Sequence, residues 1–586
     1  MRRIIALVLI VLLLWGCAPQ EALPSYITVS LSLPTGCYVD ENRQQILSGD
    51  DVFFELTLAP GYRVSGLDYD GTYSIEYGDN RVYVLLENVL YPTMATVKVT
   101  SQFCTINYEP NGAVDTAYHV SYDREQHLRP NTEIGNRFER EGYTQLGWNT
   151  EADGSGTAVG LGSRVSVPEN TLTLYAQWIK WSDASLFDYE VSEEGVRITG
   201  YHGTEETIVI PAAIGGMDVI TVGSGTFWNN TANHVILPNS LVTLEAGAFE
   251  GCQLQELTMF DNLENFSDDS FRNCVDLTTI HINAAEPPYG YDYRRESCLA
   301  DKVDILIEAQ GNRKIVFYGG CSMWYNLNGE LAQNMIGEEL QVINLGLNGV
   351  INSTAQMQIL SHFMEEGDVF FHTPEISSEA QLLIRTAMIN HDRKLWSGME
   401  YNYDLVSLID LRTVEDFFDI YYYWLSTKKS ATSYTQRYVD YLGNDYVDQY
   451  GCASFYRDYN DDVLEDKVSL NPSYMDPDAL ARMESHYQVL QDRGVTIYVS
   501  YACVNVDALP EGEIENAELM DQLFRESFSN IEGVTVLGTL QDHLFHNTDF
   551  YDTNYHLLTS TSLLTTYNWM EDLVPQLVAD GIISEK

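Results

Sequence analysis

The chain has 586 residues, of which 85 are Asp or Glu and 32 are Lys or Arg, so its formal net charge at pH 7 is −53. So negative a charge repels phosphate backbones, which excludes nucleic acid as an expected partner. Hydrophobic residues make up 45% of the chain and allow real cores, which excludes wholesale disorder. At roughly 100–200 residues per domain, the length predicts about three to five domains.

The first residues read as a targeting segment. Arg2 and Arg3 precede an apolar run that is too short for a comfortable membrane span and is typical of a secretory signal. The residues Leu14-Trp15-Gly16-Cys17 resemble a bacterial lipobox. The resemblance implies a signal peptide over residues 1–16, lipidation of Cys17, and a protein tethered by this lipid to the outer face of the cell membrane, within the cell envelope. A plain signal peptide or an uncleaved anchor is the alternative.

Eight further cysteines are scattered along the chain, with no CxxC pair and no His/Cys cluster. This spacing predicts neither a zinc site nor a dense disulfide framework. We therefore expect no metal and no cofactor, and the sequence leaves the oligomeric state open.

Residues 25–101 carry β signals throughout. Segments at 26–33 and 52–58 alternate or run apolar, Gly, Asp and Pro turns separate them, and helical periodicity is absent. We expect a small β domain here.

Residues 102–178 have a more specific pattern. A short strand with aromatic and apolar anchors comes first, at Tyr143, Leu146 and Trp148. Gly154 and Gly156 then allow a tight turn. A closing strand follows, in which Leu172, Leu174 and Ala176 alternate with other residues. The pattern resembles the InlB B-type, or Listeria–Bacteroides, repeat of bacterial surface proteins. This resemblance implies a compact β-grasp-like module that is a spacer or a binding unit. We expect its aromatic residues to be core rather than a ligand site.

Residues 179–285 repeat with a period of 22 residues. Phe227, Phe249 and Phe271 follow this interval, as do Cys252 and Cys274. A unit this short cannot bury its own apolar face, so about three or four visible copies must stack into a solenoid. The AFxxC spacing resembles the BspA-type leucine-rich repeat, which implies extracellular recognition or adhesion by a concave strand face, with a structural spacer as the alternative. We expect the two cysteines to stack as small buried groups rather than as a disulfide.

Residues 286–299 are rich in Pro, Gly and Tyr and form an expected linker to an α/β domain over residues 300–586. Apolar runs predict strands at 314–318, 340–344, 369–371, 496–500 and 534–537, and helical patterns lie between them at 356–364, 480–490 and 520–528. The alternation predicts a parallel sheet covered by helices on both faces, a three-layer α/β fold. Ligands bind beyond the carboxyl ends of such strands, so the residues that follow the strands are the candidates for a site.

Three segments after predicted strands carry candidate chemistry. The first contains Cys321 and Ser322, the second Asn344, Gly346 and Gly349, and the last Asp552 and His556. The carboxylate could orient the imidazole, which would deprotonate a nucleophile from the first segment while glycine N–H groups receive the oxyanion.

The order of these segments resembles the SGNH/GDSL hydrolase superfamily, particularly its DltD-related cell-surface members, over residues 310–586. The resemblance implies a flavodoxin-like three-layer sandwich and ester hydrolysis or acyl transfer on cell-wall polymers or glycans. In this comparison Asn344, Gly346 and Gly349 match the block that supplies the oxyanion or binding groups. Asp552 and His556 match the closing pair of the catalytic triad.

Two departures from the family pattern bear on activity. The position of the catalytic serine holds Cys321, with Ser322 one residue later, and a thiol is an effective nucleophile where a histidine lowers its pKa. The third family block commonly supplies an asparagine to the oxyanion hole, whereas this chain has His372-Thr-Pro-Glu375 there. Because loss of one oxyanion donor costs about 10²–10³ in rate, this departure argues for weak activity or none. Asp368, His372 and Glu375 could also line a pocket, but the sequence gives them no role.

An aromatic insertion spans 417–456 and includes Phe417–Trp424. We expect its rings to pack over the sheet rather than to stack on sugars. Two hypotheses follow for the whole chain. It is a tethered esterase or acyltransferase that acts on an acylated envelope glycan or a related ester, or it is a non-catalytic adhesin that binds an envelope glycan or surface protein and carries a degenerate hydrolase domain.

Overall fold

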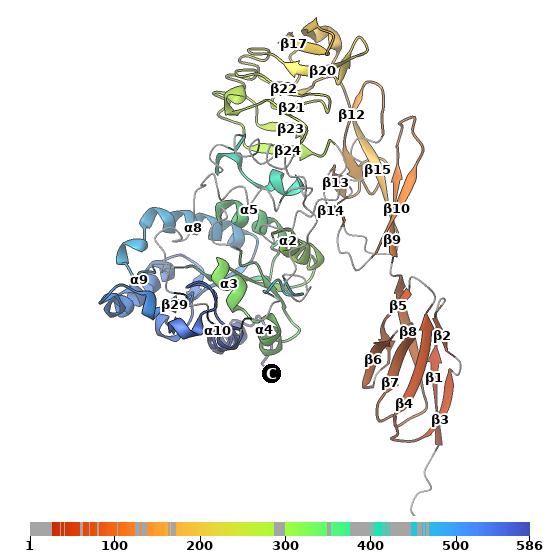
Figure 1. Ribbon diagram of the computed structural model, residues 1–586, viewed down its shortest axis with the longest axis vertical. Coiled ribbons are helices and arrows are strands. Elements are labelled where there is room, and N and C mark those ends of the chain that lie inside the picture. Colours follow the sequence, from red (N-terminus) through yellow and green to blue (C-terminus); the bar gives the residue numbers. More distant parts are fainter. Residues whose placement is uncertain are drawn as a thin grey trace, which may run out of the picture. The chain divides into compact units, whose positions relative to one another are not determined.

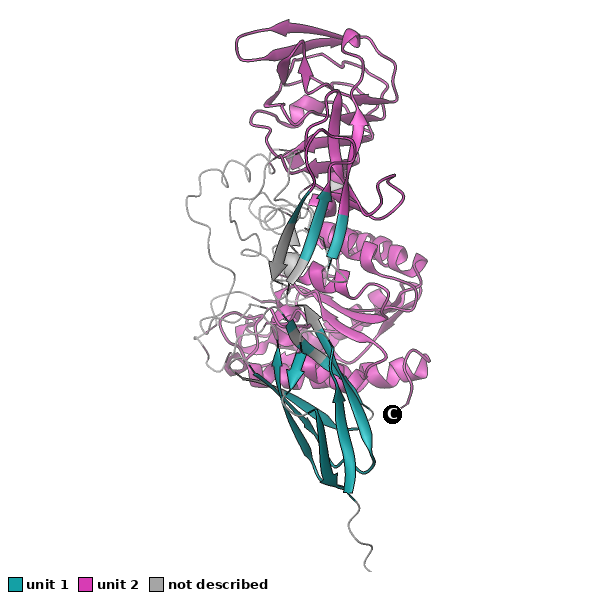
Figure 2. Ribbon diagram, turned by 90° about the vertical axis from the view of Figure 1, so that its right-hand side faces the viewer, with its two compact units in different colours: residues 1–108, 118–127, 167–173 teal, residues 109–117, 128–166, 174–586 magenta. Residues whose placement is uncertain are grey.

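The structure, a computed structural model, describes residues 26–585 except for 35–36, 40–41, 59–61, 70, 79–80, 102, 124–128, 131–137, 162–163, 166–170, 286–298, 348–352, 376–398, 400–402, 414–416, 419–420, 422–446, 454–456, 458–459, 461–462 and 464–467. The expected signal peptide and Cys17 therefore lie outside the described residues. No helix within the described part of the chain is long and apolar enough to cross a membrane. Two compact units are distinguished in Figure 2: residues 1–108, 118–127 and 167–173, and residues 109–117, 128–166 and 174–586.

The first unit contains a β-sandwich. One sheet has the order β3 (Arg43–Leu47), β1 (Tyr26–Ser32), β8 (Thr93–Ser101), β5 (Tyr62–Asp68), and the other has the order β2 (Cys37–Val39), β4 (Val52–Leu58), β7 (Arg81–Leu86), β6 (Tyr73–Gly78). Alternate residues of these strands are buried, and Val29, Phe54, Val84 and Val97 share one core. Period-2 alternation is what two packed sheets require, so the β signal in this stretch is confirmed.

A five-stranded sheet follows, with the order β10 (Tyr118–Asp123), β9 (Phe103–Glu109), β15 (Thr171–Lys180), β12 (Tyr143–Asn149), β13 (Ala158–Gly160), next to the short pair β11 (Arg129–Pro130) and β14 (Arg164–Val165). Trp148 is 1% exposed and packs edge-on against Phe138, as expected for a core residue. Leu146 is only half-buried, contrary to the expected anchor role, because a bulge between Gln145 and Gly147 shifts the alternation of β12.

The repeat region forms a short solenoid. The strands β18 (Thr207–Val209), β21 (His234–Ile236), β23 (Glu256–Phe260) and β24 (Thr279–Asn283) pair in parallel and in register, and Figure 1 shows the last three stacked in chain order. A second sheet holds β16 (Phe187–Val191), β17 (Val196–Tyr201), β20 (Met217–Val222) and β19 (Ala213–Ile214), with β22 (Thr243–Leu244) paired to β20.

The 22-residue period appears in three dimensions as a ladder of phenylalanine rings. The ring of Phe249 stacks on Phe227 at 4.7 Å and on Phe271 at 5.4 Å, with interplanar angles of 3° and 6°. The cysteines follow the same step: Cys252 and Cys274 are unpaired thiols, and each donates to the carbonyl of the phenylalanine one coil earlier, at 2.9 Å. Both thiols therefore donate to backbone carbonyls inside the stack; Cys252 is buried, as expected, whereas Cys274 is only partly buried.

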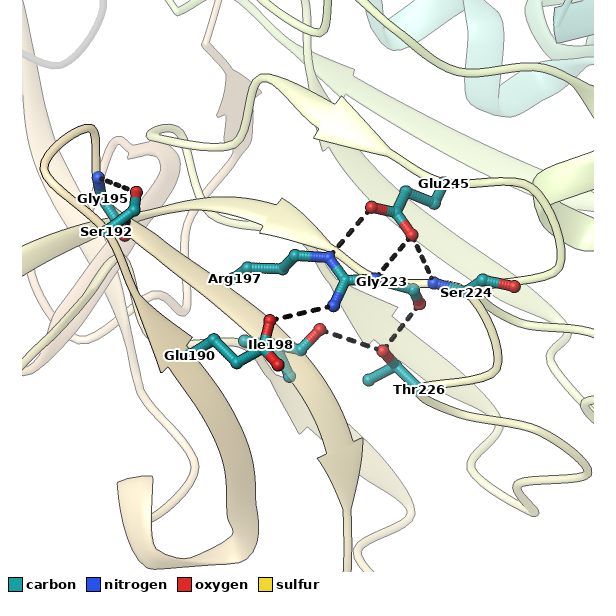
Figure 3. A network of polar contacts seen from close by, with 9 residues as sticks. All are labelled: Glu190, Ser192, Gly195, Arg197, Ile198, Gly223, Ser224, Thr226 and Glu245. Atoms are coloured by element: carbon teal, nitrogen blue, oxygen red, sulfur yellow. Dashed lines mark hydrogen bonds and ion pairs between the residues drawn. The ribbon is translucent and has the colours of Figure 1, made fainter.

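An arginine fork stabilises the N-terminal end of the solenoid (Figure 3). Arg197 of β17 donates through Nε and Nη2 to the two carboxylate oxygens of Glu245, at 3.0 and 2.8 Å, and Glu245 also accepts the N–H of Ser224. The hydrogen bonds from Arg197 lower the pKa of Glu245. Since a two-pronged pair fixes orientation as well as distance, the fork links the β16–β17 hairpin to the coils that follow it.

Aromatic residues of the insertion cover the C-terminal end of the solenoid. Phe418 stacks on Phe271 at 4.6 Å and meets Phe266 edge-on, so it adds one more ring to the ladder. Tyr421 also packs on Phe266. The expectation that these rings pack over the α/β sheet is therefore wrong for Phe417, Phe418 and Tyr421, which share the core of the solenoid. The reason is that the last coil of a stack has no neighbour to bury its apolar face.

The C-terminal region is a three-layer α/β fold. Its five parallel strands have the order β26 (Gln341–Asn344), β25 (Lys314–Gly319), β27 (Val369–Thr373), β28 (Thr496–Val499), β30 (Val534–Val536), which is the 2-1-3-4-5 order of doubly wound sheets. All five predicted strands are present. A small separate pair is formed by β29 (Val504–Asn505) and β31 (Leu544–Phe545).

Alternate residues of the inner strand β25 face different helical layers. Val316 and Tyr318 pack with α2 (Leu299–Glu308), α5 (Ser353–Phe363), α8 (Pro477–Asp492) and α9 (Ala517–Ser529). Ile315 and Phe317 pack with α3 (Cys321–Asn326), α4 (Gly329–Ile336) and α10 (Thr559–Ala579). Every side chain of β25 is buried, as a central parallel strand requires.

Candidate functional site

The turn after β25 presents both candidate nucleophiles. Gly320 caps α3, so Cys321 and Ser322 are the first two residues of that helix. A Cβ atom on Gly320 would come within 2.4 Å of Oε1 of Glu375, so a larger residue here would displace that carboxylate. Cys321 is part-exposed and packs against the pair Trp324 and Tyr325.

Asp552 and His556 form the expected dyad. Nδ1 of His556 lies 2.6 Å from Oδ1 of Asp552. The opposite ring nitrogen, Nε2, is buried and has no hydrogen-bond partner. A carboxylate at Nδ1 fixes the ring orientation and leaves Nε2 as the proton acceptor, which is the arrangement of a general base.

The loop that carries His556 is bonded directly to the helix that carries Cys321. Asn326 in α3 donates through Nδ2 to the carbonyl of Tyr555 at 2.9 Å and accepts at Oδ1 from the N–H of Leu557 at 2.8 Å. The ring of Tyr325 stacks on the imidazole of His556 with centroids 3.6 Å apart and an interplanar angle of 5°. The structure therefore brings together the first and last predicted segments, which are more than 200 residues apart in the sequence.

Ser322 is hydrogen-bonded to Glu375 rather than to the imidazole. Its hydroxyl donates to Oε1 of Glu375 at 2.6 Å, and its N–H donates to the same oxygen at 3.1 Å. Both residues are buried. This contact joins the ends of β25 and β27, which is the switch point where ligands bind in such sheets.

Asn344 and Gly346 have contacts that link β26 to α3. Nδ2 of Asn344 donates to the carbonyl of Met323 at 2.9 Å, and its Oδ1 accepts the N–H of Gly346 at 2.8 Å. A Cβ at Gly346 would come within 2.3 Å of the backbone nitrogen of Trp324, so the close approach requires glycine. The expected oxyanion donors at these two residues are therefore engaged within the fold. Gly349 lies outside the described residues.

Other polar residues near the strand ends are structural. His372 at the end of β27 is buried, its Nδ1 lies 2.7 Å from Oη of Tyr487, and burial lowers its pKa to about 3. Burial also lowers the pKa of His543, to about 4, and its ring stacks between Tyr501 and Trp569. Both imidazoles are neutral at physiological pH.

The two buried histidines predict a loss of stability in acid. Their folded pKa values lie below the unfolded value of about 6.5, so the unfolded chain takes up protons first as the pH falls. Stability should be complete above about pH 6.5 and fall towards pH 3–4, and at pH 5 each imidazole accounts for about 2 kcal/mol of the loss. Denaturant titrations between pH 7 and 4 measure this slope. His543→Phe should flatten it because Nδ1 of His543 has no partner to lose, whereas His202→Gln on the surface should not; equal slopes in all three proteins would contradict the assignment.

The sequence assigned no role to three contributors to this site. Glu375, Asn326 and Arg457 contact the predicted segments through single side chains that no spacing rule identifies. For Glu375 there was one clue, its position just after the third strand. Within the described residues, no group of three His, Cys, Asp or Glu side chains could hold a metal ion.

Comparison with known proteins supports the two repeat regions. Residues 105–177 match the Listeria-Bacteroides repeat domain, and residues 208–292 match the BspA type leucine rich repeat region in 6 copies, more than the three or four turns visible in the sequence. A proposed membrane protein of Evansella cellulosilytica is 45% identical over 53 residues, which cover 9% of this chain and 8% of that protein. A solved leucine-rich repeat protein of T. pallidum matches at 18% identity and a TM-score of 0.14, over 17% of this chain and 71% of that one. The two family matches confirm the two repeat resemblances, and such repeats are typical of surface or recognition proteins.

Proposed function

We propose that the C-terminal α/β domain is an SGNH-type ester hydrolase or acyltransferase in which Cys321 is the nucleophile, His556 the general base and Asp552 the carboxylate that orients the base. One observation carries the proposal: the imidazole is bonded to Asp552 at 2.6 Å and keeps a buried, unpartnered Nε2. Its loop is bonded to the helix that begins with Cys321.

The contacts of Ser322 favour Cys321 over its neighbour. Glu375 accepts both the hydroxyl and the N–H of Ser322, and the hydroxyl would have to leave this buried carboxylate before it could attack. Cys321 is part-exposed, and it lies one helical turn before Tyr325, whose ring stacks on His556. Ser322 is the alternative nucleophile.

The chemistry follows from these positions. His556 takes the thiol proton at Nε2 as Sγ of Cys321 bonds to the ester carbonyl carbon. The tetrahedral adduct collapses to a thioester, the carbon–oxygen bond of the leaving group breaks, and the imidazolium returns the proton to the departing oxygen. Water or an acceptor hydroxyl then attacks the thioester, gives its proton to His556, and releases the thiolate, which regains the proton. Of the three residues Asn344, Gly346 and Gly349, only Gly349 is left as an expected donor to the oxyanion of the tetrahedral adduct.

We place this activity at the cell surface. A lipid on Cys17 would tether the protein to the outer face of the membrane, and an acylated envelope glycan or a related ester is the expected substrate. The repeat regions would bind an envelope glycan or surface protein and keep the domain near its substrate. The strongly negative chain favours neutral or cationic partners.

Covalent labelling tests the assignment. The protein would be treated with an activated aryl ester, and the acylated residue located by peptide mass spectrometry. We expect acylation on Cys321, none in Cys321→Ala, and a rate about 10²–10⁴-fold lower in His556→Ala. Cys274→Ser, a variant of a part-buried repeat thiol, is the matched control and should label like the parent. Acylation of Ser322 would transfer the nucleophile role, and equal labelling of the parent, Cys321→Ala and His556→Ala would remove the proposal.

A further inference from the structure

A side chain from just beyond the aromatic insertion contacts the site. Arg457, the residue that follows the insertion, is 3% exposed. Its Nε donates to the carbonyl of Leu557 at 3.0 Å and its Nη2 donates to the carbonyl of Tyr325 at 2.6 Å. One guanidinium therefore bridges the residue after His556 and the helix that starts at Cys321.

The backbone of Arg457 is bonded to the start of α10, directly after this loop. Its N–H donates to Oγ1 of Thr559 at 2.9 Å, and its carbonyl accepts the N–H of Thr559 at 2.8 Å. These two backbone hydrogen bonds fix the main chain of Arg457, so its guanidinium is anchored at both ends of the side chain. A planar guanidinium with two directed donors fixes geometry in a way that the single point charge of lysine does not.

Asn326 makes a second bridge between the same two elements. Its amide bonds to the residues immediately before and after His556, namely Tyr555 and Leu557. A one-residue shift of the loop would break both of these bonds and the bond from Arg457 to Leu557. The imidazole would also lose its stacking on Tyr325, whose ring has the Arg457 guanidinium carbon 5.3 Å from its centroid.

We propose that Asn326 and Arg457 are positioning residues that hold the His556 loop in register with the helix of Cys321, and so set how closely Nε2 of His556 can approach the thiol during the reaction. The inference rests on the proposed function, because it assigns these residues a role only through the Cys321–His556 pair. It also makes the residue that follows the insertion a part of the site.

The pH profile of Cys321 alkylation tests this role without a known substrate. Iodoacetamide modification of Cys321 would be followed by peptide mass spectrometry from pH 5 to 9.5 in the full chain, in Asn326→Ala, Arg457→Lys and His556→Ala. A thiol paired with histidine ionises well below the ordinary pKa of about 8.5. We expect the parent to react with such a lowered midpoint, and each of the three variants to move the midpoint towards 8.5, with a rate at pH 6.5 about tenfold lower.

The rate at pH 9.5 separates positioning from general loosening. There the thiol is ionised in every variant, so Asn326→Ala and Arg457→Lys should react as fast as the parent. Asn328→Ala is the matched control: it removes the side chain that caps α4 by accepting the N–H of Leu331, a bond outside the His556 loop. This variant should be less stable but keep the parent's midpoint.

The remaining outcomes have distinct meanings. If His556→Ala shifts the midpoint while Asn326→Ala and Arg457→Lys keep the parent's profile, the positioning role is overturned and the proposed function stands. If the parent itself titrates near 8.5 and His556→Ala changes nothing, the Cys321–His556 pair is overturned. If Asn328→Ala shifts the midpoint as far as Asn326→Ala, the effect is one of stability, and the positioning role falls.

Discussion

Replacing Phe418 with alanine should open the C-terminal end of the solenoid. The ring is 3% exposed and stacks on Phe271 at 4.6 Å, while its N–H donates to Oδ1 of Asp268. Removal of a buried phenylalanine ring costs about 3–5 kcal/mol through lost burial and the cavity left behind. We expect the free energy of opening of β24, measured by hydrogen exchange of its amides, to fall by about this amount.

A conservative variant and a control variant show whether the lost ring of Phe418 is the cause. Phe418→Leu keeps much of the apolar volume and should recover a large part of the loss. Phe53→Ala, in the other compact unit, removes a ring that is 50% exposed and should leave the exchange of β24 unchanged. If β24 is protected equally in Phe418→Ala and the parent, the insertion does not cap the solenoid.

Lys314→Met should strongly destabilise the α/β region. Nζ of Lys314 lies 2.7 Å from Oδ2 of Asp368, and the two side chains are 0% and 1% exposed. The carboxylate also accepts the N–H of Lys314 and the N–H of Glu365. Removing one partner leaves an uncompensated buried charge, which costs about 3–5 kcal/mol. Urea titration of the parent and the variant measures the loss.

The double variant Lys314→Met/Asp368→Asn distinguishes charge from packing. It removes both charges and leaves an amide oxygen that can still accept a backbone N–H, so it should recover most of the lost stability. Arg412→Met breaks an ion pair of similar length, with Asp410, in which the arginine side chain is 63% exposed; it should have no measurable effect. A double variant no more stable than Lys314→Met would show that charge burial is not the cause.

The fold was predictable wherever apolar spacing sets the structure. A 22-residue period can be satisfied only by stacking, and Phe227, Phe249 and Phe271 do stack. Short apolar runs between helical patterns correctly gave all five strands of the parallel sheet. The role of Phe418 could not be predicted, because nothing local to an aromatic run shows which distant apolar surface it will cover.

The candidate site divides in the same way. The sheet topology makes the residues after its strands converge, so the meeting of the Cys321 helix with the His556 loop followed from the order of the elements. The order of the elements did not, however, predict which side chains bind the candidate nucleophile and oxyanion residues. Glu375 engages Ser322, and Asn344 engages the backbone of α3, through single hydrogen bonds that depend on ångström-scale placement. The long helix α10 went unpredicted, since its start at Thr559 has no side-chain cap and Pro575 interrupts its pattern.

The ring of Phe418 has a consequence for how this chain can vary. In an ordinary repeat array, coils can be gained or lost because each new end resembles the old one. Here the C-terminal end of the solenoid makes specific contacts with the residues that follow it. Phe271 stacks on Phe418, Asp261 accepts a hydrogen bond from Tyr403, and the carbonyl of Thr278 accepts the N–H of Leu411. Inserting a further 22-residue copy would present different side chains to these partners. We therefore expect relatives that share this cap to keep a fixed number of coils, and chains cut between the solenoid and the α/β region to be poorly soluble on either side of the cut.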